Sequence, residues 1–164
     1  MAGTTTDGEQ PMSSASGPVP VSARPLPPPD DLDGAGLEVL GRLECLGLLA
    51  RGGVGRIAVN AGALPMVLPV RYALDGERVV VCVGVGSTLD QATRHAVVAF
   101  EVDGGDAAGE WSVSLVGVAS PVADGPETAH AETLRLPRWW LGRPHRFVSI
   151  STDHLTGRRA PTWP

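Results

Sequence analysis

The loop Gly84-Val85-Gly86-Ser87-Thr88-Leu89-Asp90 has the residue types of an anion-binding turn. It follows an apolar run, and Ser87 with Asp90 three residues later forms an approximate capping box at the start of a helix. The first backbone N–H groups of a helix have no partner within it, and together with the hydroxyls of Ser87 and Thr88 they can bind an anion. The pattern therefore predicts either a site for a cofactor phosphate or an ordinary glycine turn that leads into a capped helix.

The residues that act as nucleophiles or metal ligands show no comparable pattern. Cys45 and Cys82 lie in apolar stretches, which predicts two buried, reduced thiols. Zinc sites need closely spaced cysteine and histidine pairs, and the histidines do not provide this spacing. They are His95, His130, His145 and His154. The sequence therefore predicts no metal site, with haem ligation by one histidine as the alternative.

Alternating apolar residues predict a series of short strands. The pattern is strictest in Trp111–Ala119, where every second side chain is expected on a buried face. Asp75-Gly76 predicts a tight hairpin, and Pro69 inside a strand predicts a sheet edge or a bulge. The predicted strands are 55–60, 66–73, 78–83, 97–102, 111–119 and 146–151. Six short strands joined mostly by hairpins favour a small antiparallel β-barrel.

Helical spacing is found in three segments. Leucines at positions 37, 40, 43 and 46 predict an amphipathic helix of about four turns that ends at Gly52-Gly53. Short helices are predicted over about 87–94 and 126–134. Residues 1–35 are rich in Pro, Ser, Thr and Gly, which predicts a disordered tail, so the folded domain is expected to cover residues 36–164.

Length and charge limit the class of protein. The chain of 164 residues suffices for one domain with a tail, and its net charge is -5, with all 13 basic residues being arginine. A modest acidic excess disfavours a nucleic-acid partner, because phosphate backbones are bound by clustered basic side chains. No stretch reaches the roughly 18 apolar residues of a transmembrane helix, and the N-terminus lacks the regions of a secretory signal. We therefore expect a cytoplasmic protein without a membrane or nucleic-acid partner.

Taken in order, several of these segments resemble the pyridoxamine 5′-phosphate oxidase-like family of actinobacteria. The resemblance spans about residues 36–159, which is essentially the whole predicted domain. Each motif is weak alone, but their order and spacing together are fairly specific. The motifs are Glu44-Cys45-Leu46-Gly47-Leu48-Leu49, Gly53-Val54-Gly55-Arg56-Ile57-Ala58-Val59, Pro69-Val70-Arg71-Tyr72, Gly84-Val85-Gly86-Ser87-Thr88-Leu89, Val98-Ala99-Phe100-Glu101-Val102-Asp103, Trp111-Ser112-Val113-Ser114-Leu115-Val116-Gly117-Val118-Ala119 and Thr156-Gly157-Arg158-Arg159.

The resemblance implies a mainly β fold, a six-stranded antiparallel split β-barrel with short flanking helices. It also implies a homodimer with two cofactor sites at the subunit interface. The cofactor implied is usually FMN, sometimes the deazaflavin F420 and occasionally haem. In such proteins the phosphate meets the third strand and the loop after it, which here makes Cys82, Val83, Ser87 and Thr88 the expected cofactor-binding residues.

The sequence departs from the family pattern at these phosphate positions. The family commonly has Arg-Thr where Cys82-Val83 stands and Lys where Thr88 stands, so both usual phosphate cations are missing. A dianionic phosphate in a partly buried cleft is normally held by Arg or Lys. Arg71 stands where relatives often have Asn, on the strand expected to lie beside Cys82-Val83. It is predicted either to approach the same pocket from another side or to lie on an exposed strand face.

Two further residues complete the predicted cofactor site. Arg158, next to Arg159, matches the closing Gly-Arg-Arg of the family, where an arginine faces the cofactor or the dimer partner. The alternative is a solvated pair near the C-terminus. Trp111 is expected either to pack in the barrel or at the dimer seam, or to stack on the flavin.

These features give a first hypothesis of function, an FMN-dependent oxidoreductase that acts on an unknown small substrate. In such enzymes the flavin carries out the redox chemistry, so the protein needs no dedicated catalytic acid or base. One alternative is a split barrel that has lost FMN and serves as a non-catalytic binding or regulatory module, which the missing phosphate cations favour. The other alternative is an F420-binding reductase.

Overall fold

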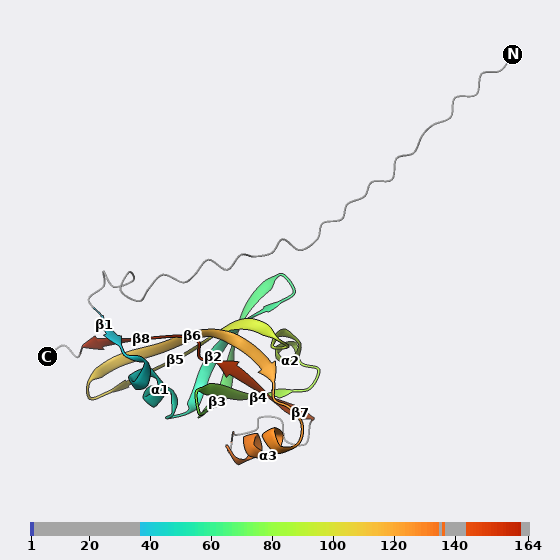
Figure 1. The fold of residues 1–164 in the computed structure, drawn as a ribbon. Coiled ribbons are helices and arrows are strands. Elements are labelled where there is room, and N and C mark those ends of the chain that lie inside the picture. Colours follow the sequence, from blue (N-terminus) through green and yellow to red (C-terminus); the bar gives the residue numbers. More distant parts are fainter. Residues whose placement is uncertain (2–36, 135, 137–143, 162–164) are drawn as a thin grey trace.

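The computed structural model describes Met1 and residues 37–134, 136 and 144–161. The predicted disordered tail, residues 1–35, lies outside the described residues apart from Met1. The helices and strands of the described part are shown in Figure 1. The strands are β1 (Glu38–Leu40), β2 (Gly53–Ala61), β3 (Leu64–Asp75), β4 (Arg78–Gly84), β5 (Ala96–Asp106), β6 (Gly109–Pro121), β7 (His145–Ser151) and β8 (His154–Pro161), and the helices are α1 (Arg42–Leu49), α2 (Thr88–Ala92) and α3 (Pro126–Thr133).

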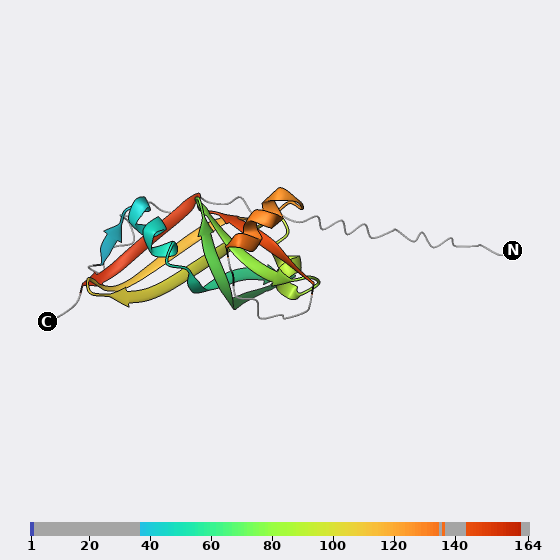
Figure 2. The same ribbon diagram turned by 90° about the horizontal axis from the view of Figure 1, so that it is seen from below.

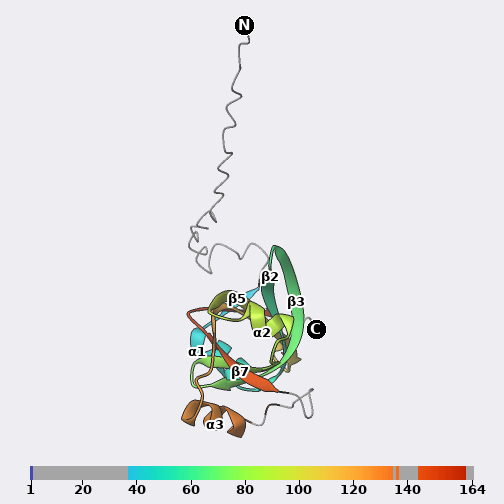
Figure 3. The ribbon, with the colours of Figure 1, turned by 90° about the vertical axis from the view of Figure 1, so that its right-hand side faces the viewer.

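The strands β6-β5-β2-β3-β4-β7 form an antiparallel barrel, which the pairing of β6 with β7 closes. In this closing contact Ala119, Ser120 and Pro121 of β6 lie opposite Ile150, Ser149 and Val148 of β7. The ring of strands is visible in Figure 3, and Figure 2 shows that the sheet continues beyond it along one side. The predicted six-stranded antiparallel barrel is therefore confirmed.

Strand β6 is shared between the barrel and a sheet extension. Its first part, Gly109–Val116, pairs with β8, and β8 pairs in turn with β1. Neither β1 nor β8 follows from the sequence pattern. The predicted four-turn helix is also wrong in its first half, because residues Glu38–Leu40 form β1 and α1 begins at Arg42. Pairing with β8 satisfies the backbone of β1, and Leu40 is buried at 5% exposure.

The core lies inside the barrel and under α1, and the alternation of β6 shows how it is filled. Trp111, Val113 and Leu115 are buried, whereas Ser114 between them and Val118 further on are exposed. The predicted one-sided burial of this strand is therefore confirmed. The same alternation in β2 and β5 gives the barrel one apolar inner face and an outer face that is more exposed.

Helix α3 lies outside the ring of strands (Figure 3) and covers a second, smaller cluster that includes Val80 and Phe147. Two side-chain hydrogen bonds hold this region, one between His130 Nε2 and Asp75 Oδ1 at 2.9 Å and a longer one between His145 Nε2 and Glu132 Oε1 at 3.4 Å. In the described residues, each helix is far too short to cross a bilayer.

Strands β3 and β4 diverge at one side of the barrel. β3 pairs with β4 only from Tyr72 to Asp75, whereas its earlier part, from Leu64 onward, pairs with β2. The other edge of this earlier part has no strand partner among the described residues, and Pro69 lies within it. The sheet edge predicted from Pro69 is therefore confirmed, because a proline there removes no ladder hydrogen bond on the open side.

Candidate functional site

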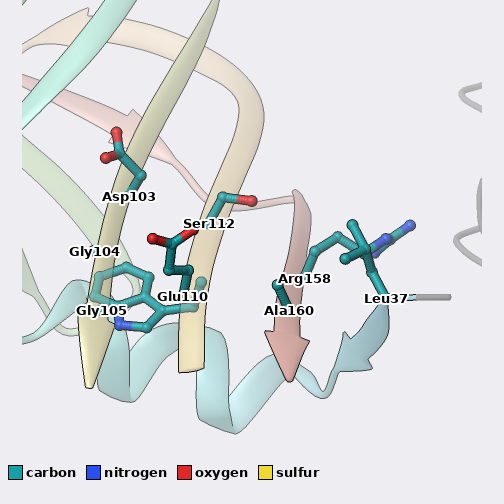
Figure 4. A pocket seen from close by; sticks show the side chains of 9 residues that line it. Leu37, Asp103, Gly104, Gly105, Glu110, Ser112, Arg158 and Ala160 are labelled. Carbon is teal, nitrogen blue, oxygen red and sulfur yellow. The ribbon is translucent and has the colours of Figure 1, made fainter. Parts of the chain in front are cut away.

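Two of the predicted cofactor residues, Trp111 and Arg158, line one open pocket of about 410 Å³. The strand register brings its wall together, because Asp103 of β5 lies opposite Ser112 of β6, which lies opposite Arg158 of β8. Figure 4 shows these side chains on three neighbouring strands. The other lining residues are Leu37, Gly104, Gly105, Glu110 and Ala160. The pocket thus combines an indole, a guanidinium and two carboxylates.

The indole of Trp111 is 7% exposed and is tightly enclosed by its neighbours. Gly104 lies opposite it on β5, and a Cβ at position 104 would come within 2.6 Å of an indole carbon. The guanidinium carbon of Arg51 lies 5.4 Å from the ring centroid. The indole nitrogen is buried without a hydrogen-bond partner among the described residues. Since a buried N–H without an acceptor is unfavourable, a ligand or water oxygen that reached it would be stabilised there.

The outer face of the sheet beside this pocket carries an apolar patch. Its residues neighbour one another across four strands, and the most exposed are Val97 at 67% and Val67 at 64%. We call this set the outer apolar patch, and it comprises Ala58, Val67, Val97, Ala99, Val116 and Val118. Arg56 borders the patch and forms ion pairs with Glu101 and Asp103. An exposed apolar patch with a charged border is typical of protein–protein contact surfaces.

Arg71, Cys82 and Val83 lie near the place where β3 and β4 diverge, just beyond the last paired residues Tyr72 and Val81. The Arg71 side chain is exposed, without a hydrogen bond or ion pair to the described residues. Cys82 is half-buried, rather than fully buried as predicted, and packs against the cluster under α3. Val83 is 1% exposed in the barrel core. Of these three residues, Arg71 alone carries a charged group.

The Gly84–Asp90 loop starts α2 in the way its capping residues predict. Ser87 is the N-cap, and its hydroxyl accepts a hydrogen bond from the Asp90 N–H at 3.1 Å. In return the Asp90 carboxylate accepts one from the Gly86 N–H at 2.8 Å. The capped helix is confirmed, and an anion already occupies the start of the helix, namely this carboxylate.

Two arginines complete the surroundings of Asp90, which is itself 0% exposed. Arg94 Nη2 donates a hydrogen bond to Oδ2 at 3.0 Å. Arg146 Nε lies 3.0 Å from Oδ1, an ion-pair distance without hydrogen-bond geometry. Burial alone would raise the pKa of Asp90, but the Gly86 hydrogen bond and the two guanidinium groups outweigh it and hold the pKa below its usual value. Asp90 is therefore a charged, internally neutralised group at neutral pH.

Thr88 points away from this cluster and lines a separate hollow of about 220 Å³. The hollow lies between the tip of the β2–β3 hairpin and α2, and its other lining residues are Asn60, Ala61, Gly62, Gln91 and Ala92. No charged side chain belongs to this lining, and Arg71 is not part of it. The hollow offers a ligand only neutral hydrogen-bonding groups.

Sequence reasoning missed Asp90, Arg94 and Arg146 as a unit. The spacing of Asp90 and Arg94 by four residues is a signal that could have indicated their pairing on a helix. Arg146 gives no such signal, because it reaches the loop only through the pairing of β7 with β4, which places it opposite Val83. Asp103 and Glu110 of the 410 Å³ pocket likewise come together only through the register of β5 and β6, which the sequence pattern does not contain.

Comparison with known proteins identifies the family. The model of the pyridoxamine 5′-phosphate oxidase family matches residues 41–159, which includes all elements from α1 to most of β8. The chain belongs to this family. An uncharacterized protein from Mycobacterium tuberculosis is 32% identical over 130 residues, which cover 73% of this chain and 83% of the relative. The oxidase-like resemblance noted in the sequence is therefore confirmed.

Two solved structures share the fold. The FAD binding protein from Mycobacterium smegmatis matches with a TM-score of 0.66 and 27% identity, over 76% of this chain and 98% of that protein. A putative pyridoxamine 5′-phosphate oxidase from Corynebacterium glutamicum matches with a TM-score of 0.69 and 27% identity, over 77% and 99% of the two chains. The split barrel is thus common to this protein and to a protein that binds a flavin.

Proposed function

We propose that this protein is a flavin-dependent oxidoreductase of the pyridoxamine 5′-phosphate oxidase family that works on a small substrate as a homodimer. The observation that carries the proposal is its similarity to the FAD binding protein from Mycobacterium smegmatis, which extends over 98% of that protein. The bound flavin would take up and pass on electrons, and the protein would bind and orient it.

The residues of the 410 Å³ pocket fit the ring part of a flavin. The buried, unpartnered indole nitrogen of Trp111 needs an acceptor, and the flavin ring presents carbonyl oxygens and ring nitrogens that accept hydrogen bonds. Arg158 and Ser112 add polar groups to the same wall. In this proposal Ser112 and Arg158, which lie opposite each other on β6 and β8, bind and orient the ring, and Trp111 packs beneath them in the core.

A blocked pocket should weaken flavin binding. Ser112→Tyr places a bulky ring in the pocket, so we expect its flavin affinity to fall by about tenfold or more. Ser114→Tyr is the matched control, because Ser114 is exposed two residues further along the same strand and does not line the pocket. Titration of purified dimers with FAD, FMN and F420, followed by absorption and fluorescence, measures both. Equal affinities of the two variants would show that the flavin does not bind in this pocket. A colourless protein that binds no flavin would refute the proposed function.

We propose the outer apolar patch as the dimer contact, with a second copy of this chain as its occupant. In a two-fold interface one substitution places two charges in the contact, so Val97→Glu should convert the dimer to a monomer. Leu43→Glu is the control, because Leu43 is 85% exposed on α1 and outside the patch. Sedimentation velocity measures the outcome. If Val97→Glu stayed dimeric, or the unmodified protein were monomeric, the patch would have another role.

A second function has support from a specific observation. Where the family commonly carries phosphate cations, this chain has a half-buried Cys82 and an exposed Thr88, and Asp90 fills the start of α2. These features favour a split barrel that has lost its flavin and acts as a binding or regulatory module. The flavin titration separates the two functions, since the module would bind none of the three flavins.

A further inference from the structure

A second hollow, of about 310 Å³, lies between α3 and the barrel. At this place α3 packs against β4 and β7 (Figure 1). Val80 and Ala131 are each 3% exposed and form an apolar floor, which the half-buried Val122 extends. The hollow shares no lining residue with the 410 Å³ pocket, so a molecule bound here would be a second ligand of the protein.

The guanidinium of Arg78 lines one wall of this hollow without a partner. Arg78 begins β4, and it makes no hydrogen bond or ion pair with the described residues. The carboxylates beside it in the β3–β4 hairpin are directed elsewhere. Asp75, directly opposite Arg78, bonds to His130 at 2.9 Å, and Glu77 pairs with Arg42. Arg78 is therefore left to bind an anionic group of a ligand.

A carboxylate without a partner lines the opposite wall. Glu127 lies in the first turn of α3, where a negative charge is favoured, and it too makes no hydrogen bond or ion pair with the described residues. The bond between His130 and Asp75 fastens α3 to β3 and so holds the two walls in place. A simple anion or cation would meet a like charge in this hollow. A zwitterion would pair with both Arg78 and Glu127.

We propose that this hollow binds a free α-amino acid with an apolar side chain. Arg78 binds the carboxylate, Glu127 binds the ammonium group, and the apolar floor takes up the side chain. Ser149 adds a neutral hydroxyl to the lining. The volume is at the small end of ligand pockets, which suits a molecule of this size. The site does not depend on the proposed flavin function.

NMR titration of the full-length protein with leucine, leucinamide and isocaproate tests the proposal. The three probes share one apolar chain, but leucinamide lacks the carboxylate and isocaproate lacks the ammonium group. Leucine should give saturable amide shifts in α3 and β4. The other two probes should bind about fivefold more weakly, because each loses one charge pair at a solvent-accessible site.

Two variants assign the charges to the walls. Arg78→Gln should bind leucine and leucinamide equally, and Glu127→Gln should bind leucine and isocaproate equally, since each variant removes the partner of the group that the probe lacks. Asp124→Asn is the matched control. It removes an exposed acidic charge just before α3 that does not line the hollow, so its affinity for leucine should be unchanged.

The unmodified protein alone can overturn the inference, without any variant having to fold. Absence of saturable shifts with leucine, valine and phenylalanine would do so, and so would shifts confined to residues outside α3 and β4. Equal affinities for leucine, leucinamide and isocaproate would show that the two charges do not take part. A loss of leucine affinity in Asp124→Asn equal to that in Glu127→Gln would show a general effect of charge. None of these results bears on the flavin titration.

Discussion

Phe100→Ala should lower the free energy of unfolding by about 3 to 5 kcal/mol, the range for removal of a fully buried phenylalanine ring. The ring of Phe100 is 0% exposed and lies edge-on to Tyr72, with 5.0 Å between the centroids and 69° between the planes. Gly55 lies against it so closely that a Cβ there would meet the ring at 2.3 Å. No neighbour can fill the space left by the ring without moving a strand, so the cavity would persist.

Denaturant unfolding followed by tryptophan fluorescence measures this loss. Leu43→Ala is the control, because Leu43 is 85% exposed and its truncation should change stability by about 0.5 kcal/mol or less. The variant also bears on the outer face of β5, because Phe100 lies in the core and the next residue, Glu101, pairs with Arg56 outside the barrel. A loss below about 1 kcal/mol would show that the barrel core relaxes around the missing ring.

The sequence predicts the barrel strands well because their signal is local. Alternation in Trp111–Ala119 and the turn at Asp75-Gly76 each involve neighbouring residues, and both are found as predicted. Gly76 has a φ of 58°, the left-handed conformation that a tight turn requires and that glycine adopts readily. Alternation and turn chemistry therefore suffice to locate the six barrel strands along the chain.

The sheet extension could not be predicted in the same way. β1 has only three residues and exists because β8 provides its hydrogen bonds, and the spacing of Leu37 and Leu40 matches a helix equally well. β8 contains Gly157, where a Cβ would lie 2.5 Å from the Cys45 sulfur. These features depend on contacts between distant parts of the chain, which a local pattern does not contain.

The candidate site shows the same division. Ser87 and Asp90 are only three residues apart in sequence, so the capped helix could be predicted from their spacing. The meeting of Trp111 with Arg158 depends on the register between β6 and β8, and the charge on Asp90 depends on Arg146 from β7. The family resemblance indicated Trp111 and Arg158 as candidates, but it did not indicate that they line the same pocket. Charge neutralisation at the Gly84–Asp90 loop could be seen only in the folded chain.

Gly117→Ala should destabilise the protein by about 3 kcal/mol, because the added methyl group has no room and its neighbour is backbone. A Cβ at Gly117 would lie 2.0 Å from the carbonyl oxygen of Ser151 and 2.9 Å from its carbonyl carbon. Gly117 is the position where β6 changes partner, since Val116 is paired with His154 of β8 and Ala119 with Ile150 of β7. The corner between β7 and β8 crosses β6 here, so the methyl group would push apart the strands that close the barrel.

Gly47→Ala is the matched control, because Gly47 lies in α1 with no atom within 4 Å of an added Cβ. It should leave stability unchanged or raise it by up to about 1 kcal/mol, since alanine favours a helix more than glycine. The displaced corner also leads directly into β8, which carries Arg158, so Gly117→Ala should weaken flavin binding at temperatures where the protein remains folded. Thermal unfolding and flavin titration on the same samples measure both effects. A Gly117→Ala protein as stable as the Gly47→Ala protein would contradict this prediction. It would mean that β7 and β8 can shift away from β6 without loss of stability, and that the barrel closure is less rigid than the β6–β7 pairing indicates.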